Sequence, residues 1–296
     1  MPVTAVRRAG LVGGLLLLTG VLTACGGPGA QPVRVLYAGS LVHLMERGLG
    51  PAFGSQSGRR VLGYAGGSLA LAYQVEGHLR RADVFLSADP SVDQQMALAA
   101  HGSWVSWYAT FAQAPLVVAY RPTARMEALF GSQPWYLALQ EPGLRVGRTD
   151  PQLDPKGALT VTLLERAAMR YHAPALDALL STGRDGAQIF PEETLLGRLE
   201  SGQLDAGFFY RSEAVQAHLP YVTPATSLDP GAVFTVTVLR GAPDPTGAVA
   251  FVRFLLGSRA AAIMNAGGLD VVRPVLAGDA RAVPPGLRAL LPGRGS

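Results

Sequence analysis

The sequence has few residues that could form cross-links, thiolate metal sites or strongly charged surfaces. Its 296 residues include a single cysteine, Cys25, and a single lysine, Lys156. One cysteine excludes an internal disulfide and any metal site built from several thiolates. Charged residues make up 16% of the chain and aromatic residues 7%, whereas hydrophobic residues reach 49%. These proportions exclude a disordered chain and provide ample apolar material for a folded core.

The excess of positive charge is small and spread along the chain. The 25 basic residues against 21 acidic ones give a formal net charge of +4, and all basic residues but Lys156 are arginines. Arg7 and Arg8 precede an apolar segment and are expected to be removed with it, which lowers the balance to about +2. Because no basic run or basic helical stripe occurs, we expect a solvated surface rather than a nucleic-acid interface.

The first 25 residues form a targeting signal. Arg7 and Arg8 provide a positive start, an apolar segment follows from Leu11 to Leu22, and Cys25 ends the sequence Leu-Thr-Ala-Cys. The apolar stretch is shorter than the roughly 20 residues that a membrane-spanning helix needs. The pattern resembles the bacterial lipoprotein signal, in which cleavage precedes the cysteine and the thiol is acylated.

We therefore predict that residues 1–24 are a signal peptide and that Cys25 is lipidated, with 25–31 as anchor and tether. The exported domain would then be held at the outer face of the cytoplasmic membrane. An ordinary signal peptide with an incidental cysteine is the alternative interpretation.

Short apolar strands alternate with helical patterns from residue 32 onward, which predicts α/β lobes with mostly parallel sheets covered on both faces. A length of 296 residues suits two lobes. We predict that lobe 1 comprises 32–110 and 228–296, and lobe 2 comprises 111–227. Strands are expected at 33–38, 60–64, 82–87, 116–120, 144–147, 206–210 and 233–239; helices are expected from 40 and 69, and at 90–100, 157–171, 193–201 and 246–256; the crossings between lobes are expected at 109–114 and 226–230.

Two Gly-Ser pairs occupy equivalent places in this pattern. Gly39-Ser40 and Gly67-Ser68 each follow a predicted strand and open a predicted helix, with Ser40 expected at the N-cap. In open parallel sheets, ligands bind at the carboxyl ends of strands. The N–H groups at a helix start are unsatisfied and the helix dipole is positive there, so the two pairs together predict an anion site. Simple helix capping is the alternative role for each serine.

Several segments together resemble the molybdate and tungstate binding proteins of ABC importers, especially the group found in archaea and some bacteria. The resemblance covers most of the chain after the targeting signal. It implies the type II periplasmic binding protein fold, in which two α/β lobes close on a ligand in the cleft between them. The segments are VLYAGSL (35–41), AGGS (65–68), ADVFLSAD (82–89), DPKG (154–157) and FFYRS (208–212).

The resemblance also implies the ligand contacts and the partners. Ser40 and Ser68 match serines that donate to the oxyanion from lobe 1, Asp154 matches an aspartate of lobe 2, and Tyr210 matches a tyrosine that closes the site. The implied partners are molybdate or tungstate, and the permease and ATPase of an ABC transporter. A monomeric receptor without cofactor, catalytic residue or metal other than the cargo oxyanion is expected, and no nucleic acid.

One departure concerns the coordination of the metal in the oxyanion. Relatives carry a glutamate immediately before the tyrosine, whereas this chain has Phe209. We therefore expect that one of two carboxylates is lost, that Glu213 does not replace it, and that the oxyanion stays four-coordinate.

The chemistry of Asp154 leaves other ligands open. A carboxylate repels a dianion, so Asp154 must be protonated, turned away or bonded to the metal, unless it only caps the following helix. Phosphate could donate its remaining proton to Asp154, and sulfate, ferric ion or an organic solute are further alternatives. Lys156, at a helix start, predicts a ligand contact or a structural partner, and Arg148 and Arg211 could enter the cleft or form surface ion pairs.

An exported enzyme or a sensor on the same scaffold is the less favoured class. The five histidines show no metal-binding spacing, and the sequence has no Gly-x-Ser-x-Gly elbow and no Gly-x-x-x-x-Gly-Lys loop. The parts needed for hydrolase or nucleotide chemistry are therefore missing from the sequence.

Overall fold

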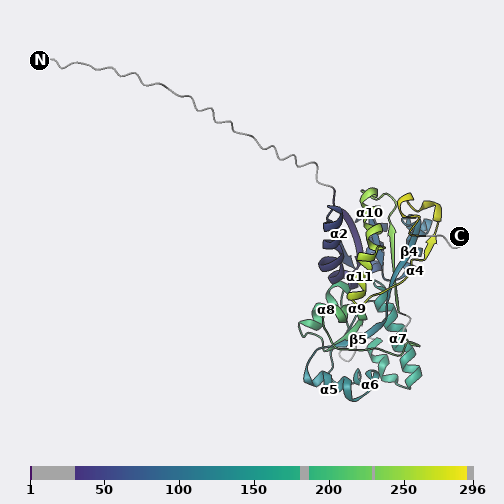
Figure 1. Ribbon diagram of the computed structural model, residues 1–296. Coiled ribbons are helices and arrows are strands. Elements are labelled where there is room, and N and C mark those ends of the chain that lie inside the picture. Colours follow the sequence, from purple (N-terminus) through teal and green to yellow (C-terminus); the bar gives the residue numbers. More distant parts are fainter. Residues whose placement is uncertain (2–30, 181–186, 229–230, 292–296) are drawn as a thin grey trace.

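The computed structural model describes residue 1 and residues 31–180, 187–228 and 231–291. The predicted signal peptide, Cys25 and almost all of the tether lie outside the described residues. The chain forms two lobes, one above the other in Figure 1, each built on a sheet with helices packed against it. The predicted two-lobed α/β architecture is confirmed.

The first lobe is built on a seven-stranded sheet, in the order β11-β4-β10-β3-β1-β2 with β12 paired to β4. Strands β2 and β3 run parallel to β1, and all three point their carboxyl ends toward the second lobe. The strands are β1 (Val33–Ala38), β2 (Val61–Gly66), β3 (Val84–Ser87), β4 (Trp107–Ala114), β10 (Ala232–Val238), β11 (Asp270–Val271) and β12 (Leu276–Gly278).

The second lobe has a five-stranded sheet in the order β7-β6-β8-β5-β9. Strand β6 pairs in parallel with β7 and β8, whereas β5 pairs antiparallel with β8 and β9. The strands are β5 (Leu116–Tyr120), β6 (Val146–Arg148), β7 (Gln188–Ile189), β8 (Ala206–Tyr210) and β9 (Tyr221–Val222).

Both sheets are mixed, so the expectation of mostly parallel sheets is wrong. The reason lies in the chain path between the lobes. Strand β4 leads into lobe 2 and β10 returns from it, so β10 runs antiparallel to both of its neighbours, β3 and β4. The segment 109–114, predicted as a crossing, is part of β4, and the chain passes at Pro115 into β5. The predicted boundary between residues 110 and 111 falls within this strand.

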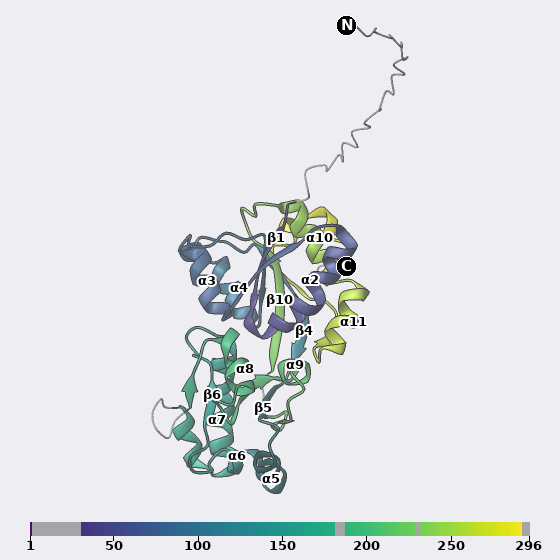
Figure 2. The same ribbon diagram turned by 90° about the vertical axis from the view of Figure 1, so that its left-hand side faces the viewer.

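Helices cover both faces of the first sheet. In Figure 2, α3 and α4 lie on one side of it, and α2, α10 and α11 on the other. Among the described residues, no single helix is long and apolar enough to cross a membrane; α10 and α11 meet these criteria only as a pair, bent by 60°. The helices of this lobe are α1 (Val42–Leu44), α2 (Gly50–Ser57), α3 (Ser68–Glu76), α4 (Pro90–Ala97), α10 (Pro245–Leu255) and α11 (Ser258–Ala266), with 3-10 turns η1 (Gly39–Leu41), η3 (Ala99–His101), η5 (Ala280–Ala282) and η6 (Pro285–Leu287) and a π-helical turn η2 (Met45–Leu49).

The second lobe carries helices α5 to α9, of which α5 and α6 lie farthest from the first lobe (Figure 1). Two helices of the first lobe, α4 and α10, begin where the sequence provides a proline preceded by an aspartate that caps the helix. Asp89 accepts a hydrogen bond from the N–H of Ser91, and Asp244 accepts one from Gly247. The second-lobe helices are α5 (Ala124–Ser132), α6 (Trp135–Ala138), α7 (Pro155–Tyr171), α8 (Glu192–Glu200) and α9 (Arg211–Gln216), with the 3-10 helix η4 (Pro174–Leu180).

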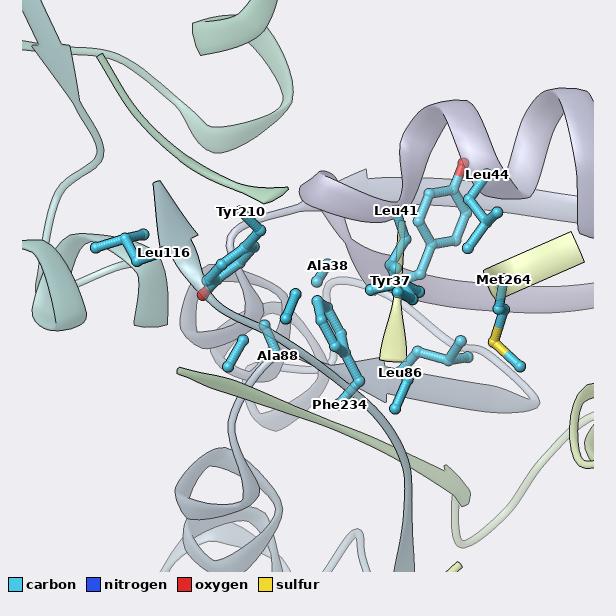
Figure 3. Packing of buried hydrophobic residues seen from close by; sticks show 14 of the residues in the cluster. Tyr37, Ala38, Leu41, Leu44, Leu86, Ala88, Leu116, Tyr210, Phe234 and Met264 are labelled. Carbon is cyan, nitrogen blue, oxygen red and sulfur yellow. The ribbon is translucent and has the colours of Figure 1, made fainter. Parts of the chain in front are cut away.

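One hydrophobic cluster continues from the first lobe into the second. Phe234 of β10 contacts Phe111 of β4, with ring centroids 6.2 Å apart, and Tyr210 of β8, with centroids 5.7 Å apart. Figure 3 shows Tyr210 and Leu116 beside Phe234 and the residues that follow β1 and β3. The crossing strands are therefore packed against the end of β8, where the predicted closing tyrosine lies.

Asp93 of α4 is a buried carboxyl group in the first lobe. It accepts a hydrogen bond from Thr235 of β10, and burial raises its pKa to about 7. The folded state therefore disfavours the ionised form, so the contribution of this group to stability is fully present below pH 4 and is lost as the pH rises through 7. We expect Asp93→Asn to remove this loss, which amounts to about 1.4 kcal/mol per unit of pKa shift. Urea unfolding at pH 5 and pH 8 tests this, with the exposed Asp177→Asn as control.

Candidate functional site

Ser40 and Ser68 lie where the first lobe faces the second. Ser40 follows β1 inside η1, and Ser68 is the first residue of α3 after β2. The N-cap of η1 is Ala38, so the expected capping role of Ser40 is wrong. Both serines are buried, and the hydroxyl of Ser68 accepts a hydrogen bond from the N–H of Ala88 at 3.2 Å. As an acceptor in that bond, Ser68 keeps its own hydrogen available for donation.

Asp154 and Tyr210 lie on the facing side of the second lobe. Asp154 occupies the N-cap position of α7 and Tyr210 is the last residue of β8; both are buried. As far as the structure describes the chain, the Asp154 side chain makes no regular capping hydrogen bond, although, against the larger rise caused by burial, polar interactions with Thr149 and with the Lys156 N–H lower its pKa. The structure thus places two predicted residues on each side of the junction between the lobes.

Unpartnered polar atoms gather at this junction. Within the described part of the chain, five buried side-chain oxygens here lack a hydrogen-bond partner. Buried polar groups in proteins are nearly always hydrogen-bonded, so such a group of atoms indicates a binding site for a polar ligand. The atoms are Ser40 Oγ, Thr149 Oγ1, Asp154 Oδ2, Glu192 Oε2 and Tyr210 Oη.

Phe209 does not face this site. Its side chain packs with Val117, Leu195 and Leu199 on the other face of β8, whereas Tyr210 belongs to the cluster that reaches the first lobe. Successive residues of a strand point to opposite faces, so a residue before Tyr210 must point away from it. The expectation that Phe209 takes the place of a site carboxylate is therefore wrong.

A second carboxylate comes from Glu192, which the sequence analysis did not identify. Glu192 begins α8 directly after Pro191, and its side chain is 1% exposed. Its Oε1 accepts a hydrogen bond from Lys156 Nζ at 2.8 Å, while Oε2 faces the first lobe, where a Cβ atom at Gly39 would overlap it. The sequence did contain a signal for this residue, because the acidic pair Glu192-Glu193 directly follows Pro191 at the start of a helix in lobe 2.

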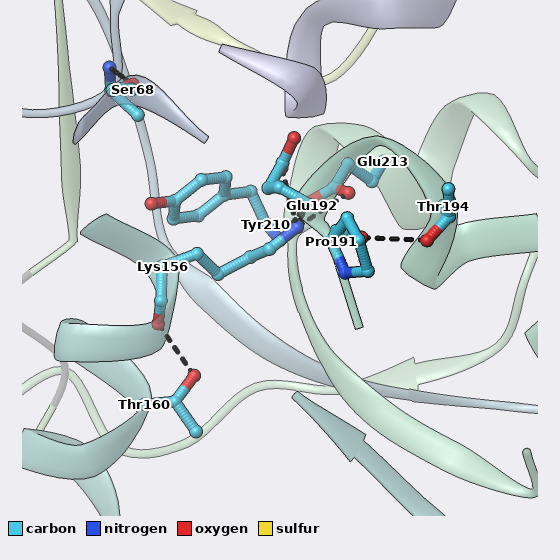
Figure 4. A network of polar contacts seen from close by, with 9 residues as sticks. Ser68, Lys156, Thr160, Pro191, Glu192, Thr194, Tyr210 and Glu213 are labelled. Atoms are coloured by element: carbon cyan, nitrogen blue, oxygen red, sulfur yellow. Dashed lines mark hydrogen bonds and ion pairs between the residues drawn. The ribbon is translucent and has the colours of Figure 1, made fainter. Parts of the chain in front are cut away.

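Lys156 is a structural partner of two glutamates. Its Nζ donates to Glu192 at 2.8 Å and to both carboxylate oxygens of Glu213 at 2.9 Å, and Lys156 is fully buried. Glu213 also accepts a hydrogen bond from the N–H of Tyr210 at 2.8 Å. Figure 4 shows this ion triad, Lys156–Glu192–Glu213, beside the ring of Tyr210. Glu213 thus lies next to the site, where it is a partner of Lys156.

Burial dominates the electrostatics of the site. Burial raises the pKa of Asp154 to about 6, although the positive charge of Lys156 opposes the rise. Burial likewise raises the pKa of Glu192 and of Tyr210 well above their ordinary values. Burial alone would lower the pKa of Lys156, but Glu192 and Glu213 outweigh it and raise that pKa, so Lys156 remains charged. Asp154 can therefore take up a proton near pH 6, and burial disfavours the ionised form of Glu192.

Arg148 and Arg211 have other partners. Arg148 is buried and donates to the carbonyl oxygens of Leu179, Thr149 and Leu180. Arg211 donates to the carbonyl of Gly268 and to Asp270, and so joins α9 to the first lobe. Among the described residues, neither arginine lines the cavities next to the site.

Two cavities flank the junction. One, of about 180 Å³, is lined by Ser40, His43 and Glu213, and the other, of about 230 Å³, by Gly67, Thr149 and Asp154 among others. Glu192 lines both. Of the predicted residues, Ser40 and Asp154 line these cavities, whereas Ser68 and Tyr210 line neither of them.

A two-lobed α/β fold with a polar site between the lobes defines a class of receptors that close on small solutes. The chain belongs to the bacterial extracellular solute-binding protein family, whose sequence profile matches residues 33–270. An ABC transporter molybdenum-binding protein of Haloferax volcanii is 41% identical over 225 residues, covering 73% of this chain and 68% of the relative. A molybdate/tungstate-binding protein of Thermococcus kodakarensis is 26% identical over 261 residues, covering 72% and 73%.

Solved structures show the same fold. The periplasmic molybdate-binding protein of Azotobacter vinelandii has a TM-score of 0.63 at 21% identity, covering 80% of this chain and 98% of that one. The sulfate-binding protein of Mycobacterium tuberculosis has a TM-score of 0.62 at 16% identity, covering 88% and 91%. At these identities the likeness concerns the fold alone, and it confirms the predicted periplasmic binding protein architecture.

The ion triad should make a large contribution to stability. Lys156→Met would leave Glu192 and Glu213 buried without a counter-charge, which typically costs about 3–5 kcal/mol. We expect urea unfolding at pH 8 to show a loss of this size. Adding Glu192→Gln and Glu213→Gln to the same chain should restore most of the stability. A loss below about 1 kcal/mol in the single variant would contradict the role assigned to Lys156.

Proposed function

We propose that the protein captures molybdate or tungstate outside the cytoplasm and delivers it to the permease of an ABC transporter and its ATPase. The observation that carries the proposal is the group of buried, unpartnered oxygens contributed by both lobes, including Ser40, Asp154 and Tyr210. The relatives named for molybdate and tungstate support this choice of ligand.

Neutral donors would bind the oxyanion. We expect the hydroxyl groups of Ser40, Ser68 and Tyr210, together with the first N–H groups of α3, to donate to the ligand between the lobes. Hydrogen bonds to a charged group are worth about 1.5–3 kcal/mol each, and nanomolar affinity needs about 12 kcal/mol. Three hydroxyl bonds and two backbone N–H bonds would supply about 8–15 kcal/mol in total, so binding needs no arginine.

Asp154 and Glu192 would decide which oxyanions are accepted. A carboxylate next to a dianion is repelled unless it is protonated or bonded to the central metal, and molybdenum and tungsten can accept such oxygen ligands. With Glu192 present, two carboxyl groups are available, so a six-coordinate centre replaces the four-coordinate one as our preferred arrangement. Phosphate is the second candidate ligand, because the unpartnered Oδ2 of Asp154 could accept its remaining proton.

The proposed location follows from the family and from the N-terminal sequence. The family consists of extracellular solute-binding proteins. We further propose that cleavage before Cys25 and lipidation of its thiol hold a monomeric receptor at the outer face of the cytoplasmic membrane. The lobe boundary at residue 227 belongs to the same proposal, whereas the first boundary lies after β4, which ends at Ala114.

Isothermal titration of the chain lacking residues 1–25 with molybdate, tungstate, sulfate and phosphate tests the ligand. We expect tight binding of molybdate and tungstate, because their centres can also engage Asp154 and Glu192. The double variant Ser40→Ala and Ser68→Ala should weaken binding at least 100-fold, since it removes two hydrogen bonds to a dianion.

The solvent-facing variant Ser132→Ala serves as the matched control and should bind like the parent chain. Absence of heat with all four ions would refute the oxyanion proposal. Sulfate binding as tight as molybdate binding would refute the preference for molybdenum and tungsten. Full affinity in the double serine variant would refute the site.

Binding should depend on pH through Asp154, whose pKa burial raises to about 6. An Asp154 oxygen that bonds the central metal must be unprotonated, so affinity should fall as the pH drops from 8 to 5.5, by up to tenfold per pH unit below the pKa of Asp154. Asp154→Asn should flatten this dependence. Titrations of tungstate at several pH values measure it, and a flat profile in the parent chain would contradict the prediction.

A further inference from the structure

A backbone hydrogen bond joins the two lobes beside the site. The N–H of Ala70 in α3 donates to the carbonyl oxygen of Leu153 in the second lobe, at 3.0 Å. Ala70 is the third residue of its helix, and the first three N–H groups of a helix have no partner within it. The next N–H, of Leu71, bonds to Gly67 inside the first lobe. The protection of the Ala70 amide therefore depends on the second lobe, and that of Leu71 does not.

Gly67 allows α3 of the first lobe to approach Leu153 of the second lobe this closely, because glycine has no side chain. A Cβ atom at position 67 would lie 2.5 Å from the carbonyl oxygen of Leu153 and 3.1 Å from Cβ of Asp154. The dihedral angles of Gly67, φ −56° and ψ 134°, suit any residue. Glycine is thus required here by contact with the other lobe and not by the backbone conformation of its own lobe.

Gly39 makes the equivalent contact at the second Gly-Ser pair. A Cβ atom there would overlap Oε2 of Glu192 and lie 2.9 Å from the backbone nitrogen of Glu193. Gly39 meets the start of α8, and Gly67 meets the start of α7. Each glycine precedes a serine of the site, so close backbone contact and ligand contact occur in the same two loops.

We infer that Gly39, Gly67 and the Ala70–Leu153 hydrogen bond form a closure latch, in which the two glycines set how closely the lobes approach. The opposite edge of the junction holds the β4–β5 crossing and the Arg211–Asp270 ion pair. At that edge the chain itself joins the lobes, whereas the latch consists of non-covalent contacts that can open. A side chain at position 67 would keep the latch open while leaving the first lobe intact.

Amide exchange of the full chain, measured by NMR without ligand, tests the latch directly. In the parent chain we expect the Ala70 amide to be protected. Gly67→Ala should speed its exchange at least tenfold, while the Leu71 amide changes less than twofold. Because alanine is a poorer cap than glycine, Gly67→Ser provides a second variant that adds a Cβ atom but keeps good capping. Gly131→Ala, where a Cβ atom meets open space, is the control.

Equal Ala70 protection in both Gly67 variants and the parent chain would overturn the inference, as would an unprotected Ala70 in the parent chain. A second arm rests on the proposed function: Gly67→Ser should raise the Kd for molybdate at least tenfold, because only a minor closed fraction can bind. Unchanged affinity there would also overturn the latch. If no oxyanion binds the parent chain, the proposed function is refuted. The exchange rate of the Ala70 amide still tests the latch in that case, because it is measured without ligand.

Discussion

The buried ammonium group of Lys156 is the interaction on which the geometry of the second lobe depends. It lies on α7 and holds one carboxylate from α8 and one from α9, and the α9 carboxylate also binds the backbone N–H of Tyr210. Three helix starts and the end of β8 are thereby fixed around a single charge. An uncompensated carboxylate in the interior is costly, so these elements cannot shift independently. The triad therefore positions Asp154 and Tyr210, and Glu192 is the member of the triad that also faces the proposed ligand.

This arrangement explains why the only lysine of the chain lies at a helix start, where a cation is unfavourable for the helix dipole. Glu192 and Glu213 lie within the first turns of their own helices, where negative charge is favourable, and together they outweigh the penalty at α7. Lysine suits this place because a compact ammonium group can donate to several oxygens at once. The same carboxylates keep it ionised.

The sequence was informative where local chemistry decides the structure. Strand β5 was predicted with its observed bounds, and the Gly-Ser pairs do lie at the carboxyl ends of β1 and β2, because apolar runs that end in glycine and serine leave few alternatives. The role of Glu192 could not be predicted in this way. Its partner Lys156 lies 36 residues away, and the Gly39 loop that it meets lies in the other lobe.

The error at Phe209 has a different origin. The alternation of side chains along β8 was visible in the sequence, and it already implied that Phe209 and Tyr210 point to opposite faces. The mixed pairing of the sheets could not be derived locally, because it follows from β10 returning from the second lobe. Short β11 and β12 likewise form only because β4 offers them a free edge.

The two walls of the site differ in chemistry, and this difference orders the steps of capture. The first lobe offers hydroxyl and N–H groups, which attract an anion at any pH, whereas the second lobe offers two carboxyl groups, which repel it when ionised. We thus expect an anion to bind first to the donors of the first lobe. The approach of the second lobe is then opposed by electrostatic repulsion between the anion and the two carboxylates. Closure then requires that Asp154 and Glu192 be neutralised, by protons or by the central metal of the ligand. The close backbone contacts at Gly39 and Gly67 confine water near those charges to the two flanking cavities, so the chemistry of the ligand itself must supply part of the compensation.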